Sequence, residues 1–100
     1  MLKYQISISP EAGRMLTEHV FFLAQVNPTA AESLRDQLLA AIRRLDTLPE
    51  RNPHFELNGQ RTRYHKMVVT ERYMLLYIIE GQNVFVEYVL DSRSDYGVLF

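Results

Sequence analysis

The sequence contains no cysteine, and this absence removes several classes of chemistry at once. Disulfide bonds, thiolate metal sites and cysteine nucleophiles are all excluded. No apolar run approaches the roughly 18 residues that a membrane-spanning helix needs. The first ten residues, MLKYQISISP, alternate polar and apolar side chains and lack the continuous apolar core of a signal peptide. These absences predict a soluble, cytoplasmic protein without a membrane partner.

Signals for bound cofactors are also missing. The chain has no glycine-rich phosphate loop, no pair of carboxylates at a spacing that stands out, and only three histidines. His19 falls among core-spaced residues, and His54 follows a proline in a region without periodicity. Neither has a second ligand at a metal-like spacing. We therefore predict neither a metal site nor a cofactor.

What is present is typical of one globular domain. The chain has 100 residues, of which 47% are hydrophobic and 23% charged, and it is long enough to fold alone as a domain spanning residues 1–100. The net charge of −1 does not by itself indicate a nucleic-acid partner. Residues 51–72, however, hold five basic and two acidic side chains. This segment is either a basic stripe or a solvated strand face.

The first half of the chain predicts a strand and two helices. Alternation from Leu2 to Ser9 is typical of a half-buried strand. Ser9-Pro10-Glu11 then predicts a helix start, because serine caps free amides and proline suits the first helical position. Apolar residues at helical spacing predict the core-facing stripe of this helix: Ala12, Met15, Leu16, Val20, Leu23 and Val26.

A second helix is predicted after the break at Asn27-Pro28. Thr29-Ala30-Ala31-Glu32 has the form of a capping box, which makes Thr29 the expected N-cap. The helix is expected to run to about Leu48. Its apolar stripe is Ala31, Leu34, Leu38, Ala41, Ile42, Leu45 and Leu48. Two helices joined by so short a break predict an antiparallel hairpin.

The second half predicts a linker followed by strands. Residues 49–60 contain two prolines and Asn58-Gly59, and are interpreted as a linker. Segments 62–70, 72–80 and 83–91 are rich in valine, isoleucine and aromatic residues, with almost nothing between them. They predict a three-stranded antiparallel meander. The fold class is therefore α+β, one sheet covered on one face by the helical hairpin.

Two short stretches carry candidate functional groups. In the strand that contains RTRYHK, alternation places Arg63 and His65 on one face and Lys66 on the other. Histidine is the side chain best suited to proton transfer near neutral pH, which makes His65 a candidate for that role. After the last strand comes a polar hook, DSRSDY, in which Arg93 stands between two aspartates and precedes Tyr96. The hook is either a solvated turn or a reaction or docking site at the end of the sheet.

The segments RYHKMVV, RYMLLYII and NVFVEYVLDSRSDY, placed after a helical hairpin, resemble the RelE/ParE superfamily of bacterial toxins. The resemblance covers the whole chain in element order, and its specific part lies in residues 61–96. It implies a toxin of a type II toxin–antitoxin module and, as partner, a cognate antitoxin. RelE-like members cut messenger RNA on the ribosome, whereas ParE-like members resemble them in fold but poison DNA gyrase.

Carried over by position, the resemblance assigns Lys66 and Arg93 to places where RelE-like toxins carry a lysine and an arginine. Met74 stands where those nucleases place an arginine. Tyr96 lies closer in sequence to Arg93 than the C-terminal tyrosine of those nucleases lies to their own hook arginine. The first expectation is a metal-independent endoribonuclease that acts on messenger RNA at the ribosome. Its expected catalytic residues are Arg93, Lys66, His65 and Tyr96, with Arg61, Arg63 and Arg72 binding the nucleic acid.

Two alternatives stay open at this point. The chain is a ParE-like inhibitor that binds DNA gyrase and performs no chemistry, or it is a non-toxic relative that only binds an antitoxin. In either case the basic strand would be an ordinary solvated face, and the two aspartates around Arg93 would fix the hook rather than tune a catalytic cation.

Overall fold

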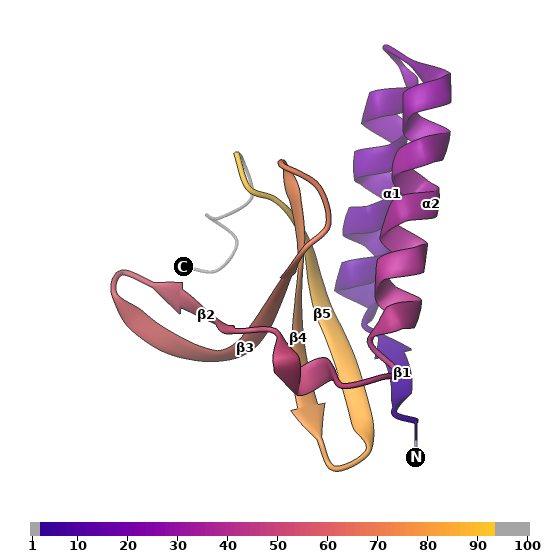
Figure 1. Ribbon diagram of the computed structural model, residues 1–100. Helices are drawn as coiled ribbons and strands as arrows, with labels where there is room; N and C mark the ends of the chain where they lie inside the picture. Colours follow the sequence, from indigo (N-terminus) through magenta and orange to yellow (C-terminus); the bar gives the residue numbers. More distant parts are fainter. Residues whose placement is uncertain (1–2, 94–100) are drawn as a thin grey trace.

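A five-stranded sheet with a helical hairpin along one side makes up the fold (Figure 1). The computed structural model describes residues 3–93. The elements are β1 (Gln5–Ile8), α1 (Pro10–Ala24), α2 (Pro28–Arg44), a 3-10 helix (Pro49–Arg51), β2 (His54–Leu57), β3 (Gln60–Val68), β4 (Tyr73–Glu80) and β5 (Asn83–Asp91). The predicted α+β class is confirmed, with its first strand, helical hairpin and three-stranded meander in the expected order.

The strands lie in the order β1-β5-β4-β3-β2, so the first and last strands within residues 3–93 are neighbours. β1 runs parallel to β5, with Gln5 opposite Asn83, and the other neighbouring strands are antiparallel. Ser9, which follows β1, connects the start of α1 to β5. Its hydroxyl accepts a hydrogen bond from the N–H of Ala12, which caps α1, and donates one to the carbonyl of Glu87 on β5.

The start of α2 differs from the prediction. Asn27, not Thr29, is the N-cap, and its side-chain oxygen accepts a hydrogen bond from the N–H of Ala30 at 3.0 Å. Pro28 occupies the first helical position, where its missing N–H costs nothing. Thr29 is therefore already inside the helix, and the capping box is not formed. The helix also ends earlier than predicted, at Arg44.

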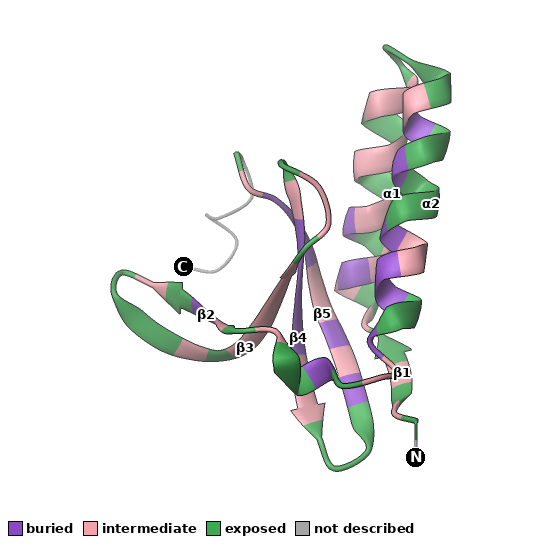
Figure 2. Ribbon diagram, viewed as in Figure 1, coloured by how far each residue is buried: buried purple, intermediate pink, exposed green. Residues whose placement is uncertain are grey.

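The core lies between the helices and the strands β4 and β5, and these two strands carry nearly all of the buried strand residues in Figure 2. The predicted stripe on α2 is confirmed at Leu34, Leu38, Ala41 and Ile42. In α1 only Ala12 and Met15 are fully buried. Val26, which was expected to face the core, is 84% exposed because α1 ends at Ala24 and the chain turns toward α2.

The linker prediction was wrong for part of its length, because it contains the edge strand β2. Leu57 pairs with Gln60 around a turn in which Asn58 and Gly59 both have positive φ, 54° and 78°. An Asn-Gly pair with this backbone is the preferred two-residue connection of a β-hairpin. β2 and β3 therefore form a hairpin, and the sheet gains a fifth strand at the edge opposite β1.

A buried tyrosine attaches the connection after α2 to the sheet. The hydroxyl of Tyr77 donates to the carbonyl of Pro49 at 2.5 Å and accepts from the side-chain amide of Asn52 at 2.9 Å. Leu48, immediately before, has a left-handed backbone with φ of 49°, which is uncommon for a leucine. The Tyr77 hydrogen bonds therefore hold this turn, and with it the start of β2, against the central strand β4.

Within residues 3–93, none of the helices combines the length and the apolar character that crossing a membrane requires.

Candidate functional site

Arg93 follows the end of β5, in a turn that is closed by Asp91. The N–H of Arg93 donates to the Asp91 carboxylate at 2.9 Å, and two guanidinium nitrogens lie 3.5 Å from the same carboxylate. The backbone contact is a normal hydrogen bond, whereas the guanidinium contacts are long. The Arg93 side chain remains 58% exposed. Asp91 therefore orients the turn through the backbone of Arg93 and leaves most of the Arg93 guanidinium available to a partner.

The environment of Asp91 makes the turn sensitive to acid. Burial alone raises the pKa of Asp91, but the N–H and the guanidinium of Arg93 outweigh burial, and the pKa lies below its usual value. A carboxyl group whose pKa is lowered by folding makes its full contribution to stability when the pH is above the pKa that the group has in the unfolded chain, near 4. That stabilisation is lost as the pH falls through the lower folded pKa.

Asp91→Asn should therefore lower the free energy of unfolding by about 1–2 kcal/mol at pH 7, the size of a hydrogen bond to a charged group. The gap between the variant and the unmodified chain should begin to close as the pH falls below about 4, the unfolded pKa, and should close as the native carboxylate becomes protonated at lower pH. Urea denaturation across this range measures the gap. Asp36→Asn, on the exposed side of α2, is the matched control and should show less than about half this effect.

Arg93 lines a cleft of about 340 Å³ between the C-terminal half of α1 and the ends of β4 and β5. Arg72 and Tyr73 form its strand side, and His19 and Phe22 belong to its helix side. The Nε2–H of His19 donates to the carbonyl of Val89 at 2.9 Å, since a carbonyl can only accept. The His19 ring also meets Tyr73 edge-on, with centroids 5.2 Å apart. These contacts fix the helix wall of the cleft against the sheet.

The outer rim of the same cleft is apolar and exposed. Phe22 is 65% exposed and Val26 is 84% exposed, and both line the cleft. Phe21, beside them, is also exposed and packs edge-on against Phe22. Large apolar side chains gathered on a surface commonly mark a site of interaction with another molecule. The cleft therefore combines two arginines with an apolar rim.

His65 lies in a second cleft, of about 680 Å³, beside the turn that precedes β2. Its ring stacks between two others, with the centroid of His54 at 4.1 Å and that of Tyr77 at 5.4 Å. The Nδ1–H of His65 donates to the carbonyl of Asn52 at 2.7 Å. Arg61 lines the same cleft, so one predicted nucleic-acid-binding residue lies near His65.

The remaining basic residues of β3 are spread over the strand. Lys66 is half-buried, and as the next residue after His65 in a strand it faces the opposite side of the sheet. Its backbone N–H donates to the carbonyl of Pro53. Arg63 is exposed, and its guanidinium lies 5.4 Å from the ring centre of its neighbour Tyr64, a distance suited to a cation–π contact.

The predicted catalytic residues thus occupy different places in the described part of the chain. His65 is opposite Tyr77 on β4, whereas the hook begins opposite Tyr73, where Asp91 pairs. Tyr73 and Tyr77 are four positions apart, which is roughly 13 Å along a strand. The structure brings Arg93 together with Arg72, and His65 together with Arg61. Tyr96 lies outside the described residues.

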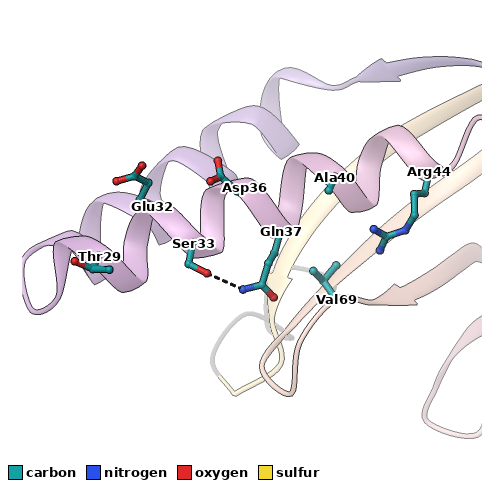
Figure 3. A pocket seen from close by; sticks show the side chains of 8 residues that line it. All are labelled: Thr29, Glu32, Ser33, Asp36, Gln37, Ala40, Arg44 and Val69. Carbon is teal, nitrogen blue, oxygen red and sulfur yellow. Dashed lines mark hydrogen bonds between the residues drawn. The ribbon is translucent and has the colours of Figure 1, made fainter.

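A third concave surface runs along the outer side of α2. It has a volume of about 610 Å³ and lies between the helix and Val69, in the connection from β3 to β4 (Figure 3). The helix side is lined by small or polar residues, and the side-chain amide of Gln37 donates to the hydroxyl of Ser33 at 3.1 Å. Glu32 and Asp36 make one end of the groove acidic, and Arg44 lies at its other end.

Sequence reasoning missed two residues of these sites. His19 matched the core spacing of the first helix, and only the fold shows that its ring contacts Tyr73 beside the Arg93 cleft. His54 was assigned to the linker, although the hairpin signal Asn58-Gly59 could have placed it on a strand beside β3. The register shift between His54 and Glu56, which brings His54 opposite His65, has no signal in the sequence. Among residues 3–93, no three histidine, cysteine or acidic side chains are grouped so that they could hold a metal ion.

A comparison with known protein families identifies the family of this chain. The model of a family described as the ParE toxin of the type II toxin–antitoxin system parDE matches residues 6–96. The chain belongs to the ParE toxin family. It is therefore a toxin of the type II toxin–antitoxin class within the RelE/ParE superfamily, as the resemblance implied. No curated protein matches the sequence of this ParE family member significantly.

Solved structures share the ParE family fold at low sequence identity. The chromosomal ParDE toxin–antitoxin system from P. aeruginosa matches with a TM-score of 0.74 and 9% identity, over 89% of this chain and 96% of that one. The conserved hypothetical protein HP0894 from Helicobacter pylori matches with a TM-score of 0.60 and 9% identity, over 93% and 97%. The E. coli DinJ-YafQ toxin–antitoxin complex matches with a TM-score of 0.55 and 18% identity, over 96% and 100%.

Proposed function

We propose that this ParE family member is a toxin that inhibits DNA gyrase by binding to it and is neutralised by a cognate antitoxin. The observation that carries the proposal is the cleft at Arg93. Two arginines, Arg72 and Arg93, lie beside the exposed Phe22 and Val26. Aromatic residues and arginine are the side chains most enriched where proteins bind other proteins. Such a surface suits recognition of a protein better than cleavage of a phosphodiester.

The distribution of the basic residues supports binding over ribonuclease chemistry. Metal-independent RNA cleavage needs an acid, a base and a cation around one phosphate. Lys66 and His65 face opposite sides of β3, and Arg93 lies beyond the far end of β5. Met74, at the position where RelE-like nucleases carry an arginine, is buried. The expected catalytic set is therefore not gathered around one point in the described residues.

A ribonuclease remains a second candidate because of one observation, the pairing of His54 with His65. Two adjacent imidazoles can share the roles of general acid and general base. Arg51 and Arg61 line the same cleft and could hold a phosphate. This candidate keeps His65 as a catalytic residue but replaces Lys66 and Arg93 with groups nearer to it.

Expression of the chain without antitoxin separates the two functions. Incorporation of labelled thymidine and methionine is followed during the first minutes after induction. Gyrase inhibition predicts early loss of thymidine incorporation while methionine incorporation continues, and a supercoiling assay with purified gyrase should show inhibition by the purified chain.

His65→Gln serves as the internal control for this experiment. The substitution should leave gyrase inhibition within about twofold of the unmodified chain, because His65 lies outside the Arg93 cleft. Early loss of methionine incorporation that His65→Gln abolishes would instead support the ribonuclease. Absence of any growth effect would support the non-toxic relative.

The groove along α2 is our candidate surface for the antitoxin. It lies on a different side of α2 from the buried stripe, and its walls come from α2 and the β3–β4 connection. The small side chains of Ser33 and Ala40 allow close approach of a partner segment, and Glu32 and Asp36 favour basic residues on that segment. An antitoxin bound here would also restrict access to the neighbouring end of the sheet.

A further inference from the structure

The chain contains four asparagines, and they differ in the residue that follows each of them. Asn27 and Asn52 each precede a proline, whose nitrogen carries no hydrogen and cannot act as a nucleophile. Asn83 precedes Val84, which is fully buried in β5 with β1 and β4 on either side. Asn58 alone precedes a glycine, and it lies in the turn between β2 and β3.

The Asn58-Gly59 turn is open to solvent, and both of its residues are exposed. Within residues 3–93 neither the backbone N–H of Gly59 nor the side-chain amide of Asn58 makes a hydrogen bond. A two-residue hairpin turn dictates this, because the ladder hydrogen bonds belong to the flanking pair, Leu57 and Gln60. A β-carbon added at Gly59 would have no atom of the described residues within 4 Å. The groups of this turn are therefore neither shielded nor engaged elsewhere.

An exposed Asn-Gly pair can react with itself. The Gly59 nitrogen forms a bond to Cγ of Asn58, the bond from Cγ to the side-chain nitrogen breaks, and ammonia leaves with the proton of the Gly59 N–H. The product is a cyclic imide, which water opens at either carbonyl. One opening gives aspartate, and the other gives isoaspartate, in which the main chain runs through the side-chain carbon. Glycine favours the attack because it has no side chain to hinder the nitrogen and its backbone rotates freely.

The edge strand β2 allows the turn to leave its hairpin geometry for the attack. β2 has four residues, and its register with β3 shifts between His54 and Glu56. It lies at the edge of the sheet, with β3 as its neighbour. Short edge elements with few buried contacts open locally at low free energy, without unfolding of the core. The turn can therefore reach the reactive geometry while β4 and β5 stay folded.

The two products have different effects on the hairpin. Asp-Gly fits the same turn as Asn-Gly, so the aspartate product keeps β2 in place. Isoaspartate inserts an extra carbon into the main chain of a turn in which Asn58 and Gly59 both have positive φ. This insertion displaces Leu57 from Gln60 and disturbs every pair that follows along β2.

We propose that Asn58 is a site of spontaneous deamidation to isoaspartate, with the Gly59 nitrogen as nucleophile and water as the second reactant, and that this change releases β2 from β3. The cleft that contains His54 and His65 is lost with β2, because His54 belongs to that strand. The inference does not depend on the target of the toxin, since none of these residues lines the Arg93 cleft.

Incubation of the purified full chain at physiological temperature in water enriched in heavy oxygen tests the site. After digestion in ordinary water, tandem mass spectrometry should find the change from amide to labelled carboxyl at residue 58 before any change at Asn27, Asn52 or Asn83. The reaction should be faster in mildly alkaline than in mildly acidic buffer, because the Gly59 N–H must give up its proton. Hydrogen exchange of the aged chain should show loss of protection in β2, while β4 and β5 keep theirs.

Asn58→Gly is the matched control, because Gly-Gly also suits this turn and has no side-chain amide to react. Its β2 should stay protected throughout the same incubation. Three results would overturn the proposal: Asn58 intact after a free peptide of residues 54–61 has been fully converted, conversion at Asn83 as fast as at Asn58, or equal loss of β2 protection in the aged Asn58→Gly chain. Gyrase inhibition plays no part in these readouts, so failure of one proposal leaves the other standing.

Discussion

Alanine at both Arg72 and Arg93 should remove most of the toxicity while the chain stays folded. Both guanidinium groups belong to the cleft beside Phe22 and Val26. A central arginine in a protein interface typically contributes 2 kcal/mol or more, so one substitution weakens binding by about 30-fold and both by up to roughly a thousandfold. Asp91 keeps its hydrogen bond from the backbone N–H of residue 93 in the variant, so the turn itself should persist.

Binding of the purified double variant to gyrase measures this effect directly, and growth after induction measures it in cells. Arg35→Ala, an exposed arginine on α2, is the matched control and should leave both unchanged. Affinity for the antitoxin should change by less than about threefold, because the α2 groove lies elsewhere. Full toxicity of the double variant would show that the Arg93 cleft is not the target-binding surface. Parallel loss of antitoxin affinity would point to a misfolded chain.

Tyr77→Phe should lower the free energy of unfolding by about 2 kcal/mol, although it removes a single oxygen atom. Tyr77 is fully buried, and its hydroxyl is the partner of both the Pro49 carbonyl and the Asn52 amide. A buried polar group that loses its partner costs about 1–3 kcal/mol. Leu48 adds to the cost, because its left-handed backbone depends on the anchoring of the residues that follow.

Urea denaturation followed by circular dichroism measures this change. Tyr4→Phe is the matched control, since the Tyr4 hydroxyl bonds to Glu50 in an exposed position and its loss should cost less than about 0.5 kcal/mol. Equal effects of the two substitutions would contradict the anchoring role of Tyr77.

The regular elements of this fold were predictable where local signals and core packing agree. Ser9 before Pro10 marked the start of α1 because the cap depends only on neighbouring residues. The stripe of Leu34, Leu38 and Ile42 marked α2 because each position faces the same core. The strands β3, β4 and β5 were recognisable from their β-branched and aromatic residues and the short turns between them.

The errors arose where two local signals competed. Asn27 and Thr29 are both good N-caps, and the position of Pro28 decided between them. The segment His54–Leu57 is too short to show periodicity, so only its pairing with β3 identifies it as a strand. Val26 continued an apolar spacing but lies beyond the end of α1. In each case a neighbouring residue or a distant strand outweighed the pattern.

The candidate site was less predictable than the fold because it depends on which strand ends meet. Arg93 and Arg72 are 21 positions apart (93 − 72) and share a cleft only because β4 and β5 are neighbours in antiparallel order. His19 joins them from α1, which no sequence spacing could indicate. Conversely, Lys66 and His65 are adjacent in sequence but are separated by the sheet itself, because side chains alternate along a strand.

The parallel pairing of β1 with β5 sets an order of events during synthesis of the toxin. Ser9 contacts the backbone of Glu87 across 78 residues, and within residues 3–93 β5 is the only strand that pairs with β1. A growing chain therefore cannot pair β1 with β5, or form the cleft at Arg93, until β5 has been made. Folding that waits for its most distant contacts is slow. The toxin is consequently inert until β5 has been made, and an antitoxin already present in the cell can meet it as it first becomes active.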